Sequence, residues 1–501
     1  MGVATLALPA RAAAALRAVV GVETPATATD LRSPASQNSP MLLADPTDPR
    51  LVVLAHRQDA PTFGCGLQVS GDSGQSWVPA NPVPHLPDGA DVCYAPEVVF
   101  DRHGTLYYLF IGLAGLGNNP TGVYLATSSD HGRTFTAPRP VLGPSHYQVR
   151  MAIDASIGAK GRLYLVWLKA ASDSALGGLT PDPNPLFSAY SDDGGATWSE
   201  PVQVSDPGRT RVVAPSIAVG RDHAVHIAYY DLQDDVRDYQ GLEGPAWDGN
   251  WSVVVTSSTD RGRRFGRGVV VDDKIGPPGR VMLIYTMPPP TLAVDGKGRV
   301  LVGWTDARNG DPDVYVAASR NDGRAFAPGV RVNDDPSGDG KDQYLPRLGA
   351  APGGRIDVVF LDRRNDPADI RNDAYFSWSQ DDGRTFAPNV KLTSQSSDTR
   401  IGQRYLVPSA EGLVEIGGRI GLLSRSTSAI AAWPDMRNAA LGSTEQDVFT
   451  TTVRFPGAPS GSSGSGTGGV LVAAGAGVVV VAALGLFLVR RRSLSRTTAV
   501  A

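Results

Sequence analysis

Ser191-Asp192-Asp193-Gly194-Gly195-Ala196-Thr197-Trp198 is the stretch that decides the fold, because it predicts the tip of a β-hairpin. A run typical of a strand, Leu186 to Tyr190, leads into it, and a second run, Pro201 to Val204, follows it. The Asp193 carboxylate can accept hydrogen bonds from the N–H groups of its own turn, and Gly195 can adopt positive φ without steric cost. The tryptophan starts the return strand, where its indole can pack beneath the turn.

The same pattern, Ser-x-Asp-x-Gly-x-Thr-Trp/Phe, occurs six times and is here named the box motif. Its third position is filled by Asp72, Asp130, Asp193, Asp260, Asn321 and Asp381. The spacing lies between 58 residues (Asp72 to Asp130) and 67 residues (Asp193 to Asp260), which indicates a repeat architecture. We expect these residues to be structural, because their side chains satisfy the turn that contains them.

The box motif resembles the Asp-box of the sialidase-like (BNR-repeat) β-propellers, and the resemblance spans nearly all of residues 40–455. It implies an all-β propeller, here as a bacterial, membrane-anchored member of that family. Repeat units open near Met41, Pro96, Ala152, Pro215, Pro290, Pro346 and Pro408. Seven openings predict seven four-stranded blades, and six blades is the alternative, because sialidases with this box are six-bladed.

The last repeat unit has neither a box nor a fourth strand. We therefore expect residues 29–40 to supply the closing strand, which removes an open sheet edge. The propeller would then occupy residues 29–455. Residues 1–28 form an alanine-rich segment that weakly resembles a signal peptide, although Arg17 interrupts its apolar part.

The C-terminal part has the composition of a membrane anchor. Residues 456–469 are mostly Gly and Ser and predict a flexible linker. The apolar run 470–489 is long enough to span a bilayer as one helix, a buried core helix being the alternative. Arginines in residues 490–501 predict a cytoplasmic tail and an extracellular propeller. The net charge of −4 gives no electrostatic case for a nucleic-acid partner.

The only cysteines are Cys65 and Cys93, and an extracellular location favours a disulfide between them, with two free thiols as the alternative. In an up-and-down propeller the box turns share one face, here named the box face. The connections to the next blade and the loops between second and third strands share the other, the crossing face. Propeller sites usually lie at the channel mouth on the crossing face, so we seek the ligand there.

Three crossing-face loops repeat an Asp-x-Arg-Asn sequence. Their residues are Asp306 with Arg308, Asp362 with Arg364, and Asp435 with Arg437. Inward arginines would suit a carboxylate ligand, since guanidinium binds carboxylate bidentately. The alternative, which repetition favours, is that each Asp–Arg pair braces its own loop. A decisive observation is whether three of Arg57, Arg150, Arg308, Arg347, Arg364 and Arg437 converge near a Tyr–Glu pair.

Aromatic residues add further ligand-binding candidates. In the crossing segments a tyrosine stands two or three residues before a proline at Tyr94, Tyr344 and Tyr405, and Tyr147 is a looser relative without the proline. They could stack on sugar rings or simply line the channel. The longest crossing-face loops are residues 170–185, 231–250 and 272–289, which carry Asp231, Tyr239, Trp247 and Trp251 and would form a cleft wall.

The resemblance to sialidases also implies an arginine triad, a Tyr nucleophile paired with Glu, and an Asp acid/base. The Phe/Tyr-Arg-Ile-Pro motif of those enzymes is absent, and Asp231, Tyr405 and Glu411 are only weak catalytic candidates. The acidic segment with Asn333, Asp334, Asp335, Asp339 and Asp342 either offers oxygen ligands for Ca²⁺ or is a solvated turn. No His/Cys metal cluster or cofactor motif is evident.

The sequence thus favours a surface-anchored propeller that binds extracellular glycan or protein ligands on its crossing face. A divergent exo-α-sialidase or other glycoside hydrolase acting on acidic glycans is the second hypothesis. A scaffold without a small ligand is the third, since a fold alone does not determine function.

Overall fold

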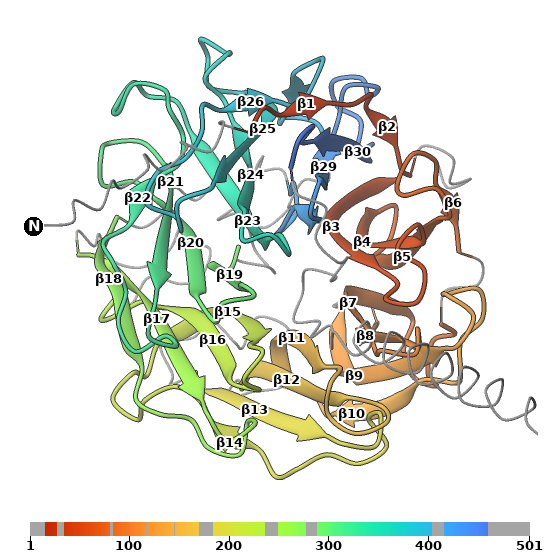
Figure 1. Cartoon of the computed structure of the whole chain (residues 1–501). Coiled ribbons are helices and arrows are strands. Elements are labelled where there is room, and N and C mark those ends of the chain that lie inside the picture. The colour runs from red at the N-terminus through yellow and green to blue at the C-terminus, as the bar shows by residue number, and fades with distance from the viewer. Residues whose placement is uncertain are drawn as a thin grey trace, which may run out of the picture. The chain divides into compact units, whose positions relative to one another are not determined.

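Seven antiparallel sheets are arranged around a common centre in the computed structural model of the chain (Figure 1). The structure describes residues 16–27, 35–80, 84–115, 118–144, 146–169, 184–235, 249–276, 288–402 and 415–458. Each sheet contains a path of four strands in meander order. The predicted seven-bladed propeller is therefore confirmed, and the six-bladed alternative is wrong.

The strands of the first four blades are as follows. Blade 1 has β3 (Ser36–Ala44), β4 (Val52–Ala60), β5 (Gly64–Ser70) and β6 (Val78–Pro79). Blade 2 has β7 (Val92–Phe100), β8 (Leu106–Ala114), β9 (Asn119–Ser128) and β10 (Arg139–Leu142). Blade 3 has β11 (His146–Asp154), β12 (Arg162–Lys169), β13 (Leu186–Ser191) and β14 (Val202–Gln203). Blade 4 has β15 (Val212–Val219), β16 (Val225–Asp231), β17 (Trp251–Ser258) and β18 (Val269–Ile275).

The remaining blades complete the ring. Blade 5 has β19 (Thr291–Val294), β20 (Val300–Asp306), β21 (Asp313–Ser319) and β22 (Val330–Arg331). Blade 6 has β23 (Gln343–Ala350), β24 (Ile356–Asp362), β25 (Arg371–Ser379) and β26 (Val390–Lys391), with β27 (Ser397–Asp398) also paired to β25. Blade 7 has β28 (Gly421–Ser424), β29 (Ser428–Asp435), β30 (Asp447–Arg454), β1 (Val19–Val20) and β2 (Thr24–Pro25).

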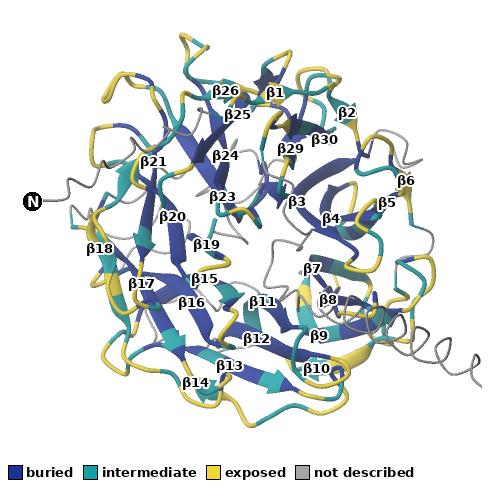
Figure 2. Cartoon of the chain, viewed as in Figure 1, coloured by how far each residue is buried: buried dark blue, intermediate teal, exposed yellow. Residues whose placement is uncertain are grey.

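The hydrophobic core lies between successive blades, because each sheet packs both faces against its neighbours. Strands β4 and β16 are buried along their whole length, and Figure 2 shows the same for the inner parts of most blades. One cluster joins Leu42 and Leu54 of blade 1 to Leu423, Ile430 and Val448 of blade 7. Most second strands consequently read as largely apolar runs, whereas the second half of β4 consists of the buried polar residues His56 to Asp59 followed by Ala60.

The ring is closed by the N-terminal segment, but not by the residues that the sequence predicts. β1 and β2 both pair antiparallel with β30, whereas Ser36–Ala44 forms the inner strand of blade 1. The closing strand therefore comes from residues 19–25 and not from 29–40, of which 29–34 lie outside the described residues. The propeller begins before residue 29, and that predicted boundary is corrected.

The six box turns share one hydrogen-bond pattern. In the third box, Ser191 Oγ donates to Asp193 Oδ1 at 2.8 Å and accepts from the Gly195 N–H at 2.8 Å. The Thr197 hydroxyl donates to Asp193 Oδ2 at 2.6 Å. A Cβ on Gly195 would meet Leu125 of the preceding blade at 2.3 Å, and φ there is +81°. Glycine is thus required both by the turn and by the close contact between blades.

Burial alone would raise the pKa of Asp130 in the second box. Hydrogen bonds from Thr134, through both its hydroxyl and its N–H, and from Ser128 instead lower this pKa to about 2. The carboxylate is therefore ionised throughout the neutral range and serves the turn.

A disulfide joins blades 1 and 2. Cys65 on β5 and Cys93 on β7 are bonded, with their Cα atoms 5.7 Å apart. A bond of this kind fits an oxidising compartment. The part of the chain that the structure describes contains no helix long and apolar enough to cross a membrane. The predicted span at residues 470–489 lies outside that part.

Candidate ligand-binding site

The innermost strands surround the centre of the ring, and five of them contain the same irregularity. In each of β3, β7, β11, β15 and β23 the pairing register shifts, and one residue at the shift has a left-handed backbone with φ between +51° and +56°. Those five residues are Ser39, Ala95, Gln148, Ala214 and Leu345. Left-handed backbone at a non-glycine residue is costly and is retained where the surrounding structure demands it. Proline follows four of the five, the exception being Gln148.

The residue two positions after each left-handed residue occupies an equivalent place on the inner strand. In blades 2, 3 and 6 this residue is charged: Glu97, Arg150 and Arg347 respectively. These strands run from the crossing face toward the box face, because the C-terminal end of each leads into the turn to the second strand, which lies on the box face. The three charged residues lie near the middle of these strands, between the two faces of the ring.

Glu97 is the centre of an ion-pair cluster. Arg150 Nη1 lies 3.2 Å from Glu97 Oε1, and Arg419 of blade 7 donates to the same oxygen. Arg419 Nε also donates to the Ser39 carbonyl at 3.1 Å. Arg150 Nε donates to the Pro215 carbonyl at 3.3 Å. The two arginines thus link inner strands of several blades while they hold the carboxylate of Glu97.

Arg347 is the third arginine of this cluster, which we name the channel arginine cluster (Arg150, Arg347 and Arg419 around Glu97). Its side chain is partly exposed and makes no hydrogen bond or ion pair with any residue that the structure describes. Burial, followed by the positive charges of Arg419 and Arg150, lowers its pKa to about 10. Three guanidinium groups surround one carboxylate, so the cluster has an excess of two positive charges.

Glu97 stays ionised in this environment. Burial would raise its pKa, but Arg419 and Arg150 outweigh burial and hold that pKa below its usual value. A carboxylate with a lowered pKa cannot act as a proton donor near neutral pH. Chemically, the cluster is suited to hold an anion, since guanidinium groups bind carboxylate and phosphate through charge-assisted hydrogen bonds.

Arg57 lies outside the channel arginine cluster, in a separate buried network. Its guanidinium contacts Asp59 at 2.7 Å and Glu415 at 3.3 Å, and it donates to the Tyr94 hydroxyl at 2.9 Å. Both acids and the arginine are almost completely buried. Two carboxylates and one guanidinium leave this network without surplus positive charge, so it does not offer an anion site.

The Asp-x-Arg-Asn loops have the geometry of braces. Each arginine pairs with the aspartate two residues before it, and each lies over an aromatic ring of the next strand. Each also reaches a second carboxylate: Arg308 reaches Asp272 at 2.7 Å, Arg364 reaches Asp334 at 2.5 Å, and Arg437 reaches Glu23 at 2.7 Å. The three partner aspartates, Asp306, Asp362 and Asp435, are fully buried.

This arrangement leads to a prediction for the brace of blade 5. Arg308→Ala and Asp306→Ala should each lower the free energy of unfolding by about 1–3 kcal/mol, because each leaves a charged partner unsatisfied. The double variant should lose less than the sum, which chemical denaturation of all three variants would measure. Arg320→Ala is the control, since Arg320 is exposed, and it should change stability by less than about 0.5 kcal/mol. Additive losses would contradict the brace.

Three tyrosine candidates, Tyr94, Tyr147 and Tyr344, lie within the inner strands β7, β11 and β23 and not in crossing loops. Tyr94 and Tyr344 are buried members of the core clusters, and Tyr344 donates to Asn372 under the guanidinium of Arg363. They are not placed to stack on a sugar at the surface. Asp231 ends β16, where it forms an ion pair with Arg209. Tyr405, Glu411, Trp247 and Tyr239 lie outside the described residues.

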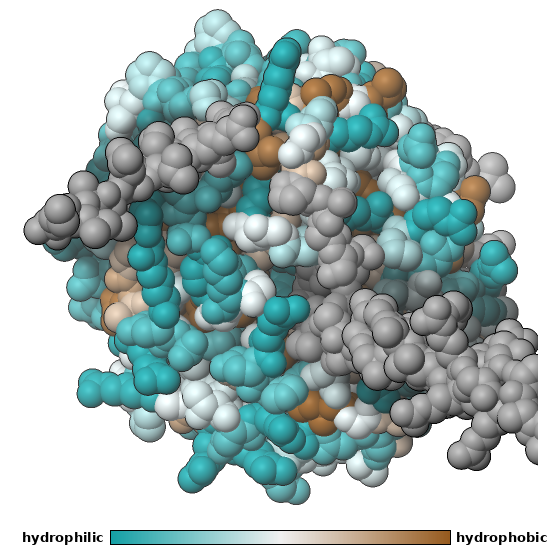
Figure 3. All heavy atoms as spheres, viewed as in Figure 1, coloured by the Kyte–Doolittle hydropathy of each residue, from teal (hydrophilic) through white to brown (hydrophobic). Residues whose placement is uncertain are grey.

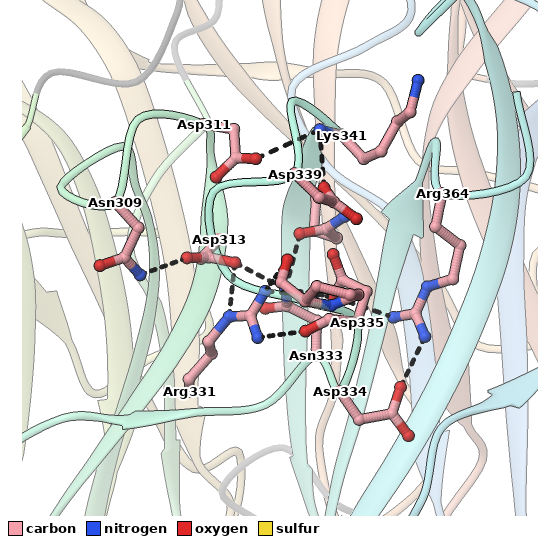
Figure 4. Close-up of polar contacts among 12 residues, drawn as sticks. Asn309, Asp311, Asp313, Arg331, Asn333, Asp334, Asp335, Asp339, Lys341 and Arg364 are labelled. Carbon is pink, nitrogen blue, oxygen red and sulfur yellow. Dashed lines mark hydrogen bonds and ion pairs between the residues drawn. The ribbon is translucent and has the colours of Figure 1, made fainter. Parts of the chain in front are cut away.

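The acidic segment after β22 is held by basic side chains. Figure 4 shows Arg331 between Asp313 and Asp335, at 2.6 and 3.3 Å, and Arg364 against Asp334. Asn333 Nδ2 donates to Asp313, Asp335 and Gln343. Within the described ranges no three His, Cys, Asp or Glu side chains are arranged to hold a metal ion. The arginine pairing accounts for the acidic residues, and Ca²⁺ binding by Asp339 or Asp342 stays a prediction.

Of the six arginines considered from the sequence, the structure brings Arg150 and Arg347 together, while Arg57, Arg308, Arg364 and Arg437 lie in other networks. Glu97 and Arg419 were not predicted. A signal for Glu97 exists in the sequence: it follows Tyr94 by three residues, as Arg150 follows Tyr147 and Arg347 follows Tyr344. Arg419 follows two glycines and has no comparable signal.

Comparison with known proteins adds the following. No family model matches the chain, and no curated protein matches it. Solved structures that resemble it include a protein of unknown function from Dyadobacter fermentans (13% identity, TM-score 0.47, 87% of this chain and 99% of that one). A Hadza microbial sialidase has 16% identity and a TM-score of 0.43, over 81% of this chain and 74% of that one. An ulvan lyase, a polysaccharide lyase, has 11% identity and a TM-score of 0.47, over 83% of this chain and 94% of that one. At these identities and TM-scores, none assigns a family, ligand or reaction to this chain.

Proposed function

We propose that this protein is a cell-surface propeller that binds a carboxylate-bearing glycan at the channel arginine cluster. The single observation that carries the proposal is Arg347, a partly exposed arginine with no partner among the described residues and two other arginines nearby. The resemblance of the box motif to sialidase-like propellers supports glycans as the ligand class. The predicted anchor at residues 470–489 and the Cys65–Cys93 disulfide support an extracellular location.

The surplus charge is the physical reason. Placing three guanidinium groups around one carboxylate is unfavourable by itself. Burial, and after it the charges of Arg419 and Arg150, lower the pKa of Arg347. Bracing of the blades explains Arg150 and Arg419, which donate to backbone carbonyls, but it does not explain Arg347. A ligand carboxylate would complete the charge balance. Figure 3 shows one face of the propeller, which is mainly hydrophilic with scattered hydrophobic residues.

Binding without turnover is the form that the described residues favour. A glycoside hydrolase needs a carboxylic acid with a raised pKa beside the ligand, whereas the pKa of Glu97 is lowered. The weak catalytic candidates Tyr405 and Glu411 lie outside the described residues, so hydrolysis is left to experiment. The scaffold hypothesis predicts no sugar binding at all.

The test is binding of the full chain in detergent to an array of neutral, uronic-acid and sialic-acid glycans, with Arg347→Met as the variant. The variant should weaken binding of acidic glycans by roughly tenfold or more, because one charge-assisted contact is lost. Its melting temperature should be unchanged or higher, because an unpaired charge is removed. Arg308→Ala is the matched control and should keep its affinity.

Two outcomes would overturn the proposal. One is acidic-glycan binding that survives Arg347→Met, and the other is an absence of binding to any acidic glycan. A fluorogenic sialoside and a uronoside, followed with the same two variants, separate turnover from binding.

A further inference from the structure

The chain leaves the propeller on the box face. In β30, Val453 pairs with Ala429, and this is the position at which Ser191 of the third box pairs with Leu163. Phe455 therefore stands where a box turn would begin. It is buried, its N–H donates to the Thr427 carbonyl at 2.8 Å, and the guanidinium of Arg355 lies 3.8 Å from its ring centre. The exit point is thus fixed on this face.

The box face also carries an uneven distribution of charge. The turns of blades 4 and 5 hold eight exposed basic side chains, which we name the basic patch: Arg221, Arg261, Arg263, Arg264, Arg267, Lys297, Arg320 and Arg324. Four acidic residues, Asp222, Asp260, Asp295 and Asp322, lie in the same turns. Asp295 is paired with the buried Arg299, and Lys297 pairs with Asp382 of the next box at 3.8 Å. The turns are neighbours, since Arg221 Nη1 donates to the Gly296 carbonyl and both Asp222 and Asp322 act on His226.

The acidic residues do not neutralise the basic patch. Asp260 is already bound by its own box, through Ser258 and the Arg264 side chain, and Asp322 pairs with Arg324 at 3.3 Å. Arg221, Arg261, Arg263, Arg267 and Arg320 form no ion pair with the described residues. The fold does not require arginine here, because the corresponding turns of blades 1 and 3 contain Gln75 and Ala196. Arg261 even occupies a left-handed backbone position, with φ of +63°.

We propose that the basic patch binds the anionic phospholipid headgroups of the membrane that anchors the chain. The Gly/Ser-rich composition of residues 456–469 predicts a flexible tether, and 14 residues of such a chain have a root-mean-square length of about 20 Å. A tether of this length starting on the box face keeps that face near the bilayer. Charges are screened beyond about 8 Å in physiological salt, so the tether supplies the proximity that the basic patch needs.

The experiment uses the full chain in nanodiscs of phosphatidylcholine alone or of phosphatidylcholine mixed with phosphatidylglycerol. Hydrogen–deuterium exchange is followed in peptides covering residues 259–267 and 320–326. The first box, residues 71–77, contains no basic residue and is the internal reference. The anionic nanodiscs should slow exchange of the two peptides by about threefold or more, because lipid-bound turns open less often. High salt should remove the effect.

Two triple variants distinguish the effect of the basic patch from that of the total charge of the protein, because each removes three arginines. The triple variant Arg261→Asn, Arg263→Gln and Arg267→Gln should lose the protection. A matched triple on the same face, Arg50→Gln, Arg102→Gln and Arg133→Gln, should keep it. Equal protection in neutral nanodiscs, or equal loss in both triples, would overturn the proposal. Protection by a soluble acidic polymer but not by phosphatidylglycerol would assign the basic patch to a different partner. Glycan binding in detergent is measured without lipid, so either proposal can fail alone.

Discussion

Removing residues 1–25 is expected to destabilise the whole propeller and not only its last blade. The deleted segment contains β1 and β2, which supply the outer edge of blade 7 by pairing with β30. Gly21 N–H donates to the Thr452 carbonyl at 2.8 Å, and the Thr450 hydroxyl donates to the Thr24 carbonyl at 3.2 Å. Without these residues the third strand of blade 7 has an open edge, and the ring is no longer closed.

The size of the loss follows from what the segment buries. Leu16, Ala18 and Val20 pack against the hydrophobic cluster of blades 6 and 7. Glu23 forms the ion pair of Arg437. Loss of several hydrogen bonds, this ion pair and the apolar contacts should cost more than about 5 kcal/mol, a large part of the stability of a typical domain. The melting temperature should fall by about 10 °C or more.

Two controls isolate the closing strands. A chain lacking only residues 1–15 controls for loss of the N-terminus itself. Val22→Ser tests the segment without disturbing it, because the Val22 side chain is 88% exposed, and it should leave the melting temperature unchanged. If the chains lacking 1–15 and 1–25 melted at the same temperature, closure by β1 and β2 would contribute nothing.

The same segment shows where prediction from sequence ends. The box motif is local, so six hairpins could be predicted from residues that lie within eight positions of one another. The count of seven blades was predicted from the seven repeat openings. Closure depends on pairing between residues 19–25 and 447–454, more than 400 positions apart, through two strands of two residues each. Strands so short have no detectable period, and the alanine-rich composition around them resembles a signal peptide more than a strand.

The candidate site could be predicted only in part, because it too depends on contacts between residues far apart in the sequence. Arg150 and Arg347 could be proposed because arginine is an expected ligand for carboxylates. Which arginines converge depends on the register shift beside Ala95, Gln148 and Leu345, and no residue type specifies a left-handed position at those places. The Asp-x-Arg-Asn repeats were the more conspicuous pattern, and the structure gives them the contacts of braces.

The second large effect is expected at Glu97. Glu97→Gln keeps the shape of the side chain but removes the only carboxylate of the channel arginine cluster, leaving Arg150, Arg347 and Arg419 without a counter-charge. Stranding buried charges in this way should lower the free energy of unfolding by about 3–5 kcal/mol. Adding Arg347→Met should recover part of the loss, because it removes one of the repelling charges and the two sites are coupled.

An anion should also recover stability in the Glu97→Gln variant, and this ties the prediction to the proposed function. Sulfate or a uronic acid that occupies the place of the lost carboxylate binds only the folded protein and so raises the melting temperature. Glu415→Gln is the matched control: it too removes a buried glutamate from an arginine, but Arg57 keeps Asp59 as its partner. Differential scanning fluorimetry with and without the anion measures both variants. A selective response of Glu97→Gln would identify the cluster as an anion site, whereas an equal response of both variants would reduce it to a general salt effect and leave the three arginines as braces.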